Sequence, residues 1–383
     1  MEIEHPSHAM RRGGVPSPLR VLFVNEDVLG HRVFARRLRR LLQEHEEVSA
    51  WFAVVPGPRR VEAVLLRRVP GLGSLDLQPL RWRLRWSWWA RRIVRRAGTG
   101  SDVLFVNTQS CALLLGGLMQ TIPTVVSVDA TGRQFARLGY WGPRGRLARL
   151  ADRPGEALER RTLERATLVM AWTEWAAESL RRDYGLAAER IVVLHPGIDL
   201  TPFASIERGP PQGGPLRLLF VGNDVERKGL PTLLAALSEV GRPVELDVVT
   251  EDAVAATEGV QVHAGIAADS REAVRMFGQA DVLVLPTHAD CVPLVVLEGM
   301  AAGLPVVSTP VGAIPELLGD AGICTAVGDV PALAAALRRL ADDPGRRLDL
   351  GARGRSRVGE RFDGALQSRR LVKLLQRAAW QPL

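Results

Sequence analysis

The stretch from Asp281 to Ser308, DVLVLPTHADCVPLVVLEGMAAGLPVVS, carries the pattern that decides the fold. Two apolar runs of strand length, Val282 to Pro286 and Leu304 to Ser308, enclose a helix-length segment from Pro293 to Ala302. Proline suits the first helical position because that position needs no backbone N–H. This order of strand, loop, helix and strand predicts a parallel βαβ unit, and such α/β folds bind ligands at the carboxyl ends of their strands. We therefore predict a doubly wound α/β fold with a binding site at the start of this helix.

Two carboxylates eight positions apart bracket the start of the same helix. The free N–H groups of Leu294 and Val295 are expected to meet a diphosphate, because a helix N-terminus binds anions. Glu298, about one turn further along, is expected to accept hydrogen bonds from a ribose, and Asp290 in the preceding loop to hold a sugar hydroxyl. The pattern indicates an enzyme that uses a nucleotide sugar.

A pair of cations follows another apolar strand, Leu216 to Val221. The chain has 48 arginines but only two lysines, and one of these two is Lys228, directly after Arg227. Arginine can fork onto phosphate oxygens while lysine supplies a compact point charge, so both types have a use at one diphosphate. We interpret the pair as a diphosphate clamp. The alternative is a solvated charged turn before a helix.

At these residues the sequence resembles the retaining glycosyltransferases of family 4, and the resemblance runs over nearly the whole chain from Leu19. It is carried by a diphosphate-binding motif, an acid pair and a turn at the end of the first domain: Gly222, Arg227, Lys228 and Gly229; Asp290 and Glu298; Pro196-Gly197-Ile198-Asp199. The resemblance implies the α/β GT-B architecture, in which two Rossmann-like, doubly wound domains face each other across a cleft. It implies that the first acid contacts the donor sugar and the second the ribose.

Three departures from the family pattern limit what the resemblance implies. Asp290 stands where the family has Glu, so this carboxylate reaches one methylene less far. Pro293 stands where many relatives have Gly and removes one backbone donor. Thr250-Glu251-Asp252 replaces a Gly-rich turn after the strand Glu245 to Val249, so the base of the nucleotide stays open.

The activity that the resemblance implies is transfer of a sugar from a nucleoside-diphosphate sugar to an acceptor hydroxyl, with retention and without a metal or other cofactor. The sequence contains no Asp-x-Asp pattern of the kind that metal-dependent transferases use. The acceptor stays open among polysaccharides, lipid-linked or anionic acceptors and small natural products. Two alternatives remain: a sugar-nucleotide epimerase of the same architecture, and a non-catalytic homologue that activates or tethers a partner enzyme.

The first domain offers further candidate residues at the ends of two predicted strands. After the strand Arg20 to Asn25, Gly30 lies where relatives let the backbone approach the donor phosphate, and His31 is expected either to contact phosphate or acceptor or to cap a helix. Asp129 follows the strand Thr124 to Val128, at or close to a position where many relatives carry a histidine. It is a candidate to orient the acceptor hydroxyl or accept its proton, and the alternative is a helix cap.

The domain organisation is read from composition and linkers. We predict a disordered leader over 1–18, an acceptor-side domain over 19–204, a Pro- and Gly-rich linker over 205–215, a nucleotide-sugar-binding domain over 216–360, and a helix over 361–383 that returns to the first domain. No apolar run of membrane-spanning length and no secretory signal occurs, so we expect a cytoplasmic protein.

The basic charge is concentrated in the first 200 residues, which hold 31 arginines and 20 acids, while the rest of the chain is slightly acidic. The segment from Pro79 to Arg96 would place Trp82, Trp86, Trp89 and Ile93 on one helical face. One interpretation is a peripheral contact with an anionic membrane at its inner face or with a lipid-linked acceptor. The other is that the Trp face packs on the first domain while the arginines are solvated. No nucleic-acid-binding motif accompanies the charge, so nucleic acid is not an expected partner.

Overall fold

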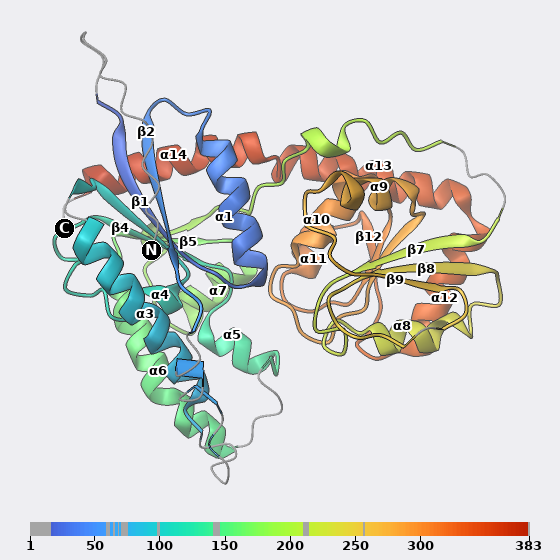
Figure 1. Cartoon of the computed structure of the whole chain (residues 1–383), viewed down its shortest axis with the longest axis horizontal. Helices are drawn as coiled ribbons and strands as arrows, with labels where there is room; N and C mark the ends of the chain where they lie inside the picture. Colours follow the sequence, from blue (N-terminus) through green and yellow to red (C-terminus); the bar gives the residue numbers. More distant parts are fainter. Residues whose placement is uncertain are drawn as a thin grey trace. The chain divides into compact units, whose positions relative to one another are not determined.

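The computed structural model describes residues 17–381 except 59–61, 64–65, 68, 70–75, 98–99, 141–145, 210–213 and 256. The chain forms two compact units (Figure 1). Unit 1 contains the chain up to His195 together with the segment from Ala365 onward, and unit 2 runs from Pro196 to Gly364. Most of the predicted leader lies outside the described residues, as does the middle of the predicted linker.

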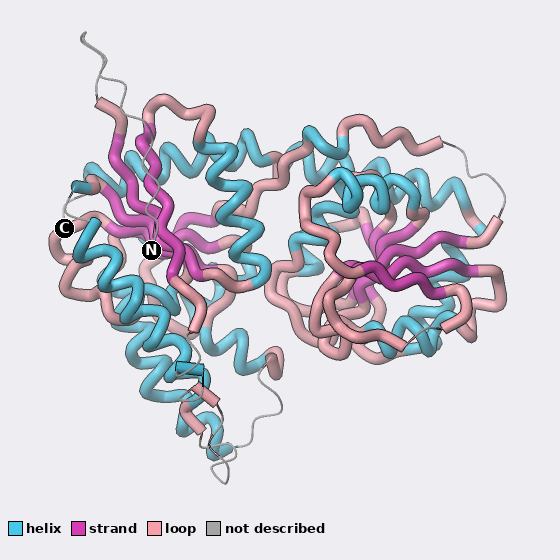
Figure 2. The backbone as a smooth tube through the Cα atoms, viewed as in Figure 1, coloured by secondary structure: helices cyan, strands magenta, loops and turns pink. Residues whose placement is uncertain are grey.

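Unit 1 is built on a six-stranded parallel sheet in the order β2-β1-β3-β4-β5-β6. Figure 2 shows the strands of the protein in magenta and the helices in cyan. Its strands are β1 Leu19–Glu26, β2 Val48–Val55, β3 Val103–Asn107, β4 Thr124–Val128, β5 Leu168–Ala171 and β6 Ile191–Val193. Its helices are α1 Leu29–Leu42, α3 Gln78–Ala97, α4 Gln109–Ala112, α5 Gly132–Arg137, α6 Arg146–Arg165, α7 Glu174–Arg182 and α14 Gly364–Trp380. The central strands are buried on both faces, which explains why they read as continuous apolar runs.

Unit 2 repeats the architecture with the order β12-β11-β10-β7-β8-β9. Its strands are β7 Leu216–Val221, β8 Val244–Val249, β9 Val260–His263, β10 Val282–Leu285, β11 Val306–Ser308 and β12 Gly322–Cys324. Its helices are α8 Leu230–Leu237, α9 Arg271–Gln279, α10 Leu294–Ala301, α11 Ile314–Leu318, α12 Val330–Asp342 and α13 Pro344–Arg361. The predicted βαβ unit is present as β10, α10 and β11, and the prediction of two doubly wound α/β domains is confirmed.

The chain passes between the units at 195/196 and 364/365, whereas the sequence suggested changes near 205–215 and at 360/361. The reason is a set of contacts that tie residues 196–204 to unit 2. Ile198 and Phe362 form a backbone hydrogen bond of 2.8 Å, and the Phe203 ring packs edge-on against Phe277. Helix α14 belongs to unit 1, where Ser368 lies 2.9 Å from the His45 ring nitrogen.

Helix α3 packs its tryptophan face inward. Trp86 and Trp89 lie against the core of unit 1 beside the fully buried Ile93, so this face is not free to enter a membrane. The expectation that the arginines are solvated is wrong for Arg83 and Arg85, whose side chains are 17% and 8% exposed and pair with Glu159 and Glu62. Within the described residues, no helix is both long and apolar enough to span a membrane.

Candidate active site

The turn between β7 and α8 places Lys228 at the carboxyl edge of the unit 2 sheet. Gly229 begins α8 in a left-handed conformation with φ +83°. A Cβ atom there would lie 2.0 Å from the carbonyl oxygen of Pro286, just after β10. Only glycine permits this approach, so the turn is held against the end of β10 and Lys228 is carried with it.

Arg227 and Lys228 converge on Asp290 from that turn. Lys228 Nζ is hydrogen-bonded to Asp290 Oδ2, and Arg227 Nη1 lies 3.8 Å from the same oxygen. Arg227 also donates to the Ala289 carbonyl at 2.6 Å and to Asp224 Oδ2 at 2.6 Å. Arg227, Lys228 and Asp290 are each only 13% exposed at the side chain. The alternative of a solvated charged turn is therefore wrong, and both cations are fixed near one carboxylate.

Helix α10 starts at Leu294, four residues after Asp290. Pro293 is its N-cap, one position earlier than expected, and Leu294 and Val295 open the first turn. Backbone N–H groups of a first turn have no partner within the helix and carry its positive dipole end. Glu298 lies in the next turn and is 8% exposed. The structure thus gathers the predicted cations, the two predicted acids and a helix N-terminus in one unit.

The loop after β8 braces the cation-bearing turn. Asn223 Oδ1 accepts the backbone N–H of Glu251 at 2.9 Å, and Asp252 Oδ2 accepts that of Val225 at 2.9 Å. The replacement of the family's Gly-rich turn by Thr250-Glu251-Asp252 therefore has a structural consequence, because its side chains hold the 222–229 turn. The role of Asn223 could not be predicted from the sequence, because its partner Glu251 lies 28 residues away.

The carboxyl edge of the unit 1 sheet carries a different group of side chains. His31, in the first turn of α1, places Nε2 3.4 Å from Glu26 Oε1 and 3.5 Å from Asp129 Oδ2. Its Nδ1 lies 3.5 Å from Asn107 Nδ2, and its ring packs edge-on against Trp172. His31 is therefore not a helix cap, and the neighbouring Gly30 is exposed.

Burial and charge set the protonation of this group. Burial raises the pKa of Glu26 to about 7, and the adjacent His31 opposes this only in part. Burial lowers the pKa of His31, but the charges of Asp129 and Glu26 outweigh it and raise that pKa to about 9. At neutral pH the imidazole is thus protonated and lies between two carboxyl groups.

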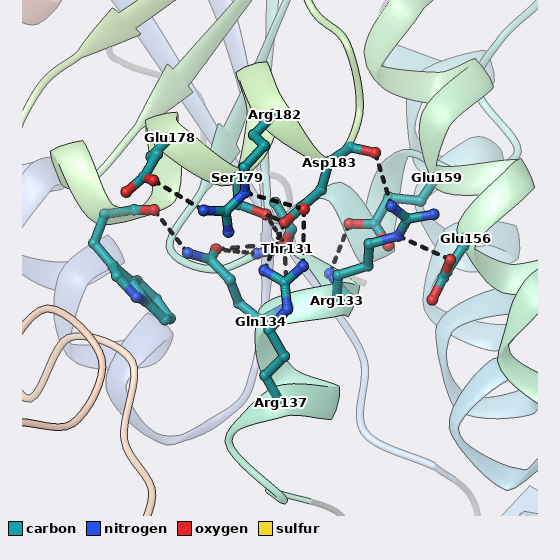
Figure 3. A network of polar contacts seen from close by, with 12 residues as sticks. Thr131, Arg133, Gln134, Arg137, Glu156, Glu159, Glu178, Ser179, Arg182 and Asp183 are labelled. Carbon is teal, nitrogen blue, oxygen red and sulfur yellow. Dashed lines mark hydrogen bonds and ion pairs between the residues drawn. The ribbon is translucent and has the colours of Figure 1, made fainter. Parts of the chain in front are cut away.

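Asp129 is also not a helix cap. Thr131 caps α5 through its hydroxyl, which accepts from the Gln134 backbone, while the Gln134 side chain accepts from the Thr131 backbone. The loop between β4 and α5 is fixed from behind by Glu159 of α6, which accepts the Gly132 N–H at 2.9 Å. Figure 3 shows Thr131, Glu159 and the surrounding polar side chains of α5, α6 and α7.

Glu159 is fully buried and is paired with Arg83 of α3 at 2.6 Å. Sequence analysis did not predict the Arg83–Glu159 pair or a role for Glu26. Both arrangements bring together residues from segments far apart in the chain. Among the described residues, no group of three or more His, Cys, Asp or Glu side chains is placed to hold a metal ion.

Comparison with known proteins agrees with this two-unit construction. Residues 28–202 match the family model described as Glycosyltransferase Family 4, and residues 215–343 match the model described as Glycosyl transferases group 1. The chain belongs to the family 4 glycosyltransferases. Among curated relatives, this glycosyltransferase is 27% identical to the MMP alpha-(1->4)-mannosyltransferase of Mycolicibacterium hassiacum over 58% of its own length and 56% of the relative's. The match thus spans about half the length of that relative.

Solved structures show that the fold of this family 4 glycosyltransferase is GT-B. Sucrose-phosphate synthase from Thermosynechococcus elongatus superposes with a TM-score of 0.71 at 18% identity, covering 94% of this chain and 98% of that one. Anabaena HepE in complex with UDP-glucose superposes with a TM-score of 0.67 at 16% identity, covering 94% and 100%.

Proposed function

We propose that this chain is a retaining transferase that moves a sugar from a nucleoside-diphosphate sugar to an acceptor hydroxyl without a metal ion. The observation that carries the proposal is the convergence of Arg227 and Lys228 on Asp290, next to the N-terminus of α10. Family membership and the UDP-glucose bound to HepE support a nucleotide sugar as donor.

The chemistry follows from where charge develops. Breaking the bond between the anomeric carbon and the diphosphate places negative charge on the leaving oxygen, and preplaced donors stabilise that charge most. Arg227, Lys228 and the first-turn N–H groups of Leu294 and Val295 are the donors in this chain. Gly222 would give the diphosphate room beside the turn, and Glu298 would accept hydrogen bonds from the ribose.

The acceptor side of the reaction is assigned to unit 1. Gly30 would let a ligand approach the backbone, since a Cβ atom there would meet nothing within 4 Å. Asp129 would orient the acceptor hydroxyl or take its proton, and His31 Nε2 lies 3.5 Å from its Oδ2. Attack on the face that the diphosphate leaves would give retention.

A thermal-shift screen of nucleotide sugars tests the donor assignment, because a ligand that binds the folded state raises the melting temperature with its occupancy. We expect one nucleotide sugar to stabilise the wild-type protein and the Glu298→Ala variant to lose that shift. The proposal fails if no nucleotide sugar stabilises the protein, or if Glu298→Ala keeps the full shift.

Product analysis with the stabilising donor separates transfer from the two alternatives. Incubation without acceptor that yields an epimer of the donor sugar would indicate an epimerase. Binding without turnover across acceptor classes would indicate a non-catalytic homologue. Transfer with the anomeric configuration preserved, in the presence of EDTA, is the expected result.

A cytoplasmic location with peripheral membrane contact is a separate part of the proposal. Only the outward side of α3 is free for it, where Trp88 is 44% exposed and stacks with Arg92. Flotation with anionic vesicles tests this contact, and we expect Trp88→Ser with Arg92→Ser to weaken it. Absence of wild-type binding would remove it from the proposal.

A further inference from the structure

Buried polar atoms without hydrogen-bond partners lie at the carboxyl edge of the unit 1 sheet. Within the described part of the chain, no partner is present for Glu26 Oε2, Asn107 Oδ1 or either polar atom of the Asn25 side chain. These three residues are 6%, 0% and 1% exposed. Because an unpaired buried polar group is costly, native proteins keep such groups where a ligand or water supplies the missing bond.

Two of these residues, Glu26 and Asn107, contact the side chain of His31. Asn25 and Asn107 are register partners in the parallel pair β1 and β3, so their side chains leave the sheet on the same face. Asn107 Nδ2 lies 3.5 Å from His31 Nδ1, and Glu26 Oε1 lies 3.4 Å from His31 Nε2. The side chains of Glu26 and Asn107, each of which has an unpaired oxygen, therefore contact the imidazole that also contacts Asp129.

The unpaired atoms of these three residues include more acceptors than donors: the oxygens of Glu26, Asn25 and Asn107 against the amide nitrogen of Asn25. Nε2 of His31 already faces Glu26 and Asp129, and its Nδ1 faces the Asn107 amide. A phosphate would bring further acceptors and negative charge beside two carboxyl groups that already share the single positive charge of His31. A hydroxyl or an ammonium group would bring the donors that the site lacks.

From this chemistry we infer that Glu26, His31 and Asn107 recognise a proton-donating group of the acceptor, a hydroxyl or an ammonium next to the hydroxyl that reacts, and disfavour a phosphate there. This inference rests on the proposed function, and it departs from the anionic acceptor that the basic composition of the first 200 residues suggested. Three of the arginines behind that composition are engaged elsewhere: Arg83 with Glu159, Arg85 with Glu62 and Arg137 with Asp183.

The test uses three probes that share one sugar ring: glucosamine, methyl α-D-glucopyranoside and glucose 6-phosphate. Full-length protein is labelled with ¹⁵N-histidine, the His31 imidazole signals are assigned with His31→Gln, and each probe is titrated at pH 7 to the same millimolar concentration. We expect glucosamine to shift the His31 signals, methyl glucoside to shift them less, and glucose 6-phosphate to leave them unchanged. The ammonium and hydroxyl arms separate the two donor types.

Glu26→Gln is the diagnostic variant, because it keeps the shape of the side chain and removes its charge. We expect it to abolish the preference for glucosamine over methyl glucoside, whereas Glu156→Gln, whose partner is Arg133 on the far side of the loop, should leave it intact. Should Glu26→Gln fail to fold, Asn107→Ser removes one accepting oxygen and is expected to weaken both shifts.

Three results would overturn the inference: a glucose 6-phosphate shift as large as that of glucosamine, no His31 response to any probe, or an unchanged preference in Glu26→Gln. None of these readouts needs a nucleotide sugar. A failed donor screen with intact probe selectivity would count against the proposed transfer alone, and the reverse outcome would count against this acceptor site alone.

Discussion

The carboxyl edges of the two sheets have the same architecture and opposite chemistry. In unit 2, two cations converge on a single acid, Asp290, beside a helix N-terminus. In unit 1, two acids, Glu26 and Asp129, enclose a single imidazole. The fold therefore fixes only where ligands bind, and the residues that end the strands decide which charge they accept. We propose that the edge in unit 2 binds an anion and that the edge in unit 1 binds proton donors.

Among the substitutions considered at the two edges, replacement of Lys228 should cause the largest loss of activity. We expect Lys228→Ala to lower kcat/KM at least about 100-fold with the donor found by screening, because it removes a preplaced charge at the leaving group. The other lysine offers a matched control, since Lys373 is exposed on α14 and Lys373→Ala should leave kcat/KM unchanged. A Lys228→Ala enzyme with more than half the wild-type activity would refute the anion-binding role of this edge.

Glycine substitutions at the two edges should differ in kind. Gly229→Ala forces a Cβ into the Pro286 carbonyl at a positive φ, so we expect a loss of about 2 to 3 kcal/mol in the unfolding free energy. Gly30→Ala meets open space and should change stability by less than about 0.5 kcal/mol while weakening ligand binding several-fold. Urea unfolding followed by far-ultraviolet circular dichroism measures the stability of both variants. Equal losses of unfolding free energy in Gly229→Ala and Gly30→Ala would contradict the expectation.

The acid pair of unit 1 should make its stability depend on pH. Both Glu26 and His31 have raised pKa values in the folded state, about 7 and about 9, so the folded state binds their protons more tightly than the unfolded state. The contribution of Glu26 is full below about pH 4.5 and lost by about pH 7, and that of His31 is full below about pH 6.5 and lost as pH passes about 9. We expect the unfolding free energy to fall by about 3 kcal/mol between pH 6.5 and 9, because one unit of pKa shift is worth about 1.4 kcal/mol.

Tryptophan fluorescence can follow this change in unit 1 alone, because all nine tryptophans lie in the sequence of that unit. His31→Gln should flatten the dependence above pH 6.5, whereas the matched surface variant His263→Gln in unit 2 should not. A wild-type stability that rises over this range would show that the carboxylates do not hold the His31 proton.

The smallest effect is expected from restoring the family's acid. Asp290→Glu adds one methylene beside Lys228, and the exchange keeps both the charge and the ion pair. We expect donor affinity to change by no more than about threefold, or about 0.7 kcal/mol, as measured by titration calorimetry. A hundredfold loss would show that the shorter acid is required for the position of the donor sugar.

The elements that sequence analysis located were those with a local signal. Continuous apolar runs marked β4, β7 and β10, and the order of strand, loop and helix placed Arg227, Lys228 and Asp290 at one edge. The positions of these three residues depend on elements close to them in sequence. The arrangement of the site in unit 2 was therefore largely predictable from motif spacing.

The features that escaped prediction depend on segments distant in sequence. Glu26 ends an apolar strand, and only the fold brings it to His31 and Asp129. The amphipathic pattern of α3 could not show whether its Trp face meets protein or lipid, because both surfaces are apolar. The boundary between the units lies at 195/196 because Ile198 is hydrogen-bonded to Phe362 of unit 2. Composition does not show this pairing, and the Pro- and Gly-rich segment after it was therefore predicted as the linker.

Because the chain has only two lysines, the environment of Lys228 can be monitored by chemical modification of amines. Acylating reagents attack neutral side-chain amines, and the chain offers two such side chains, one per unit. Lys373 is exposed, whereas Lys228 is sheltered and held by Asp290, so the former should react fast and the latter slowly. Peptide mass spectrometry after brief acylation would therefore measure how accessible Lys228 is in untagged protein. A ligand that contacts Lys228 would lower the rate at which this residue is acylated.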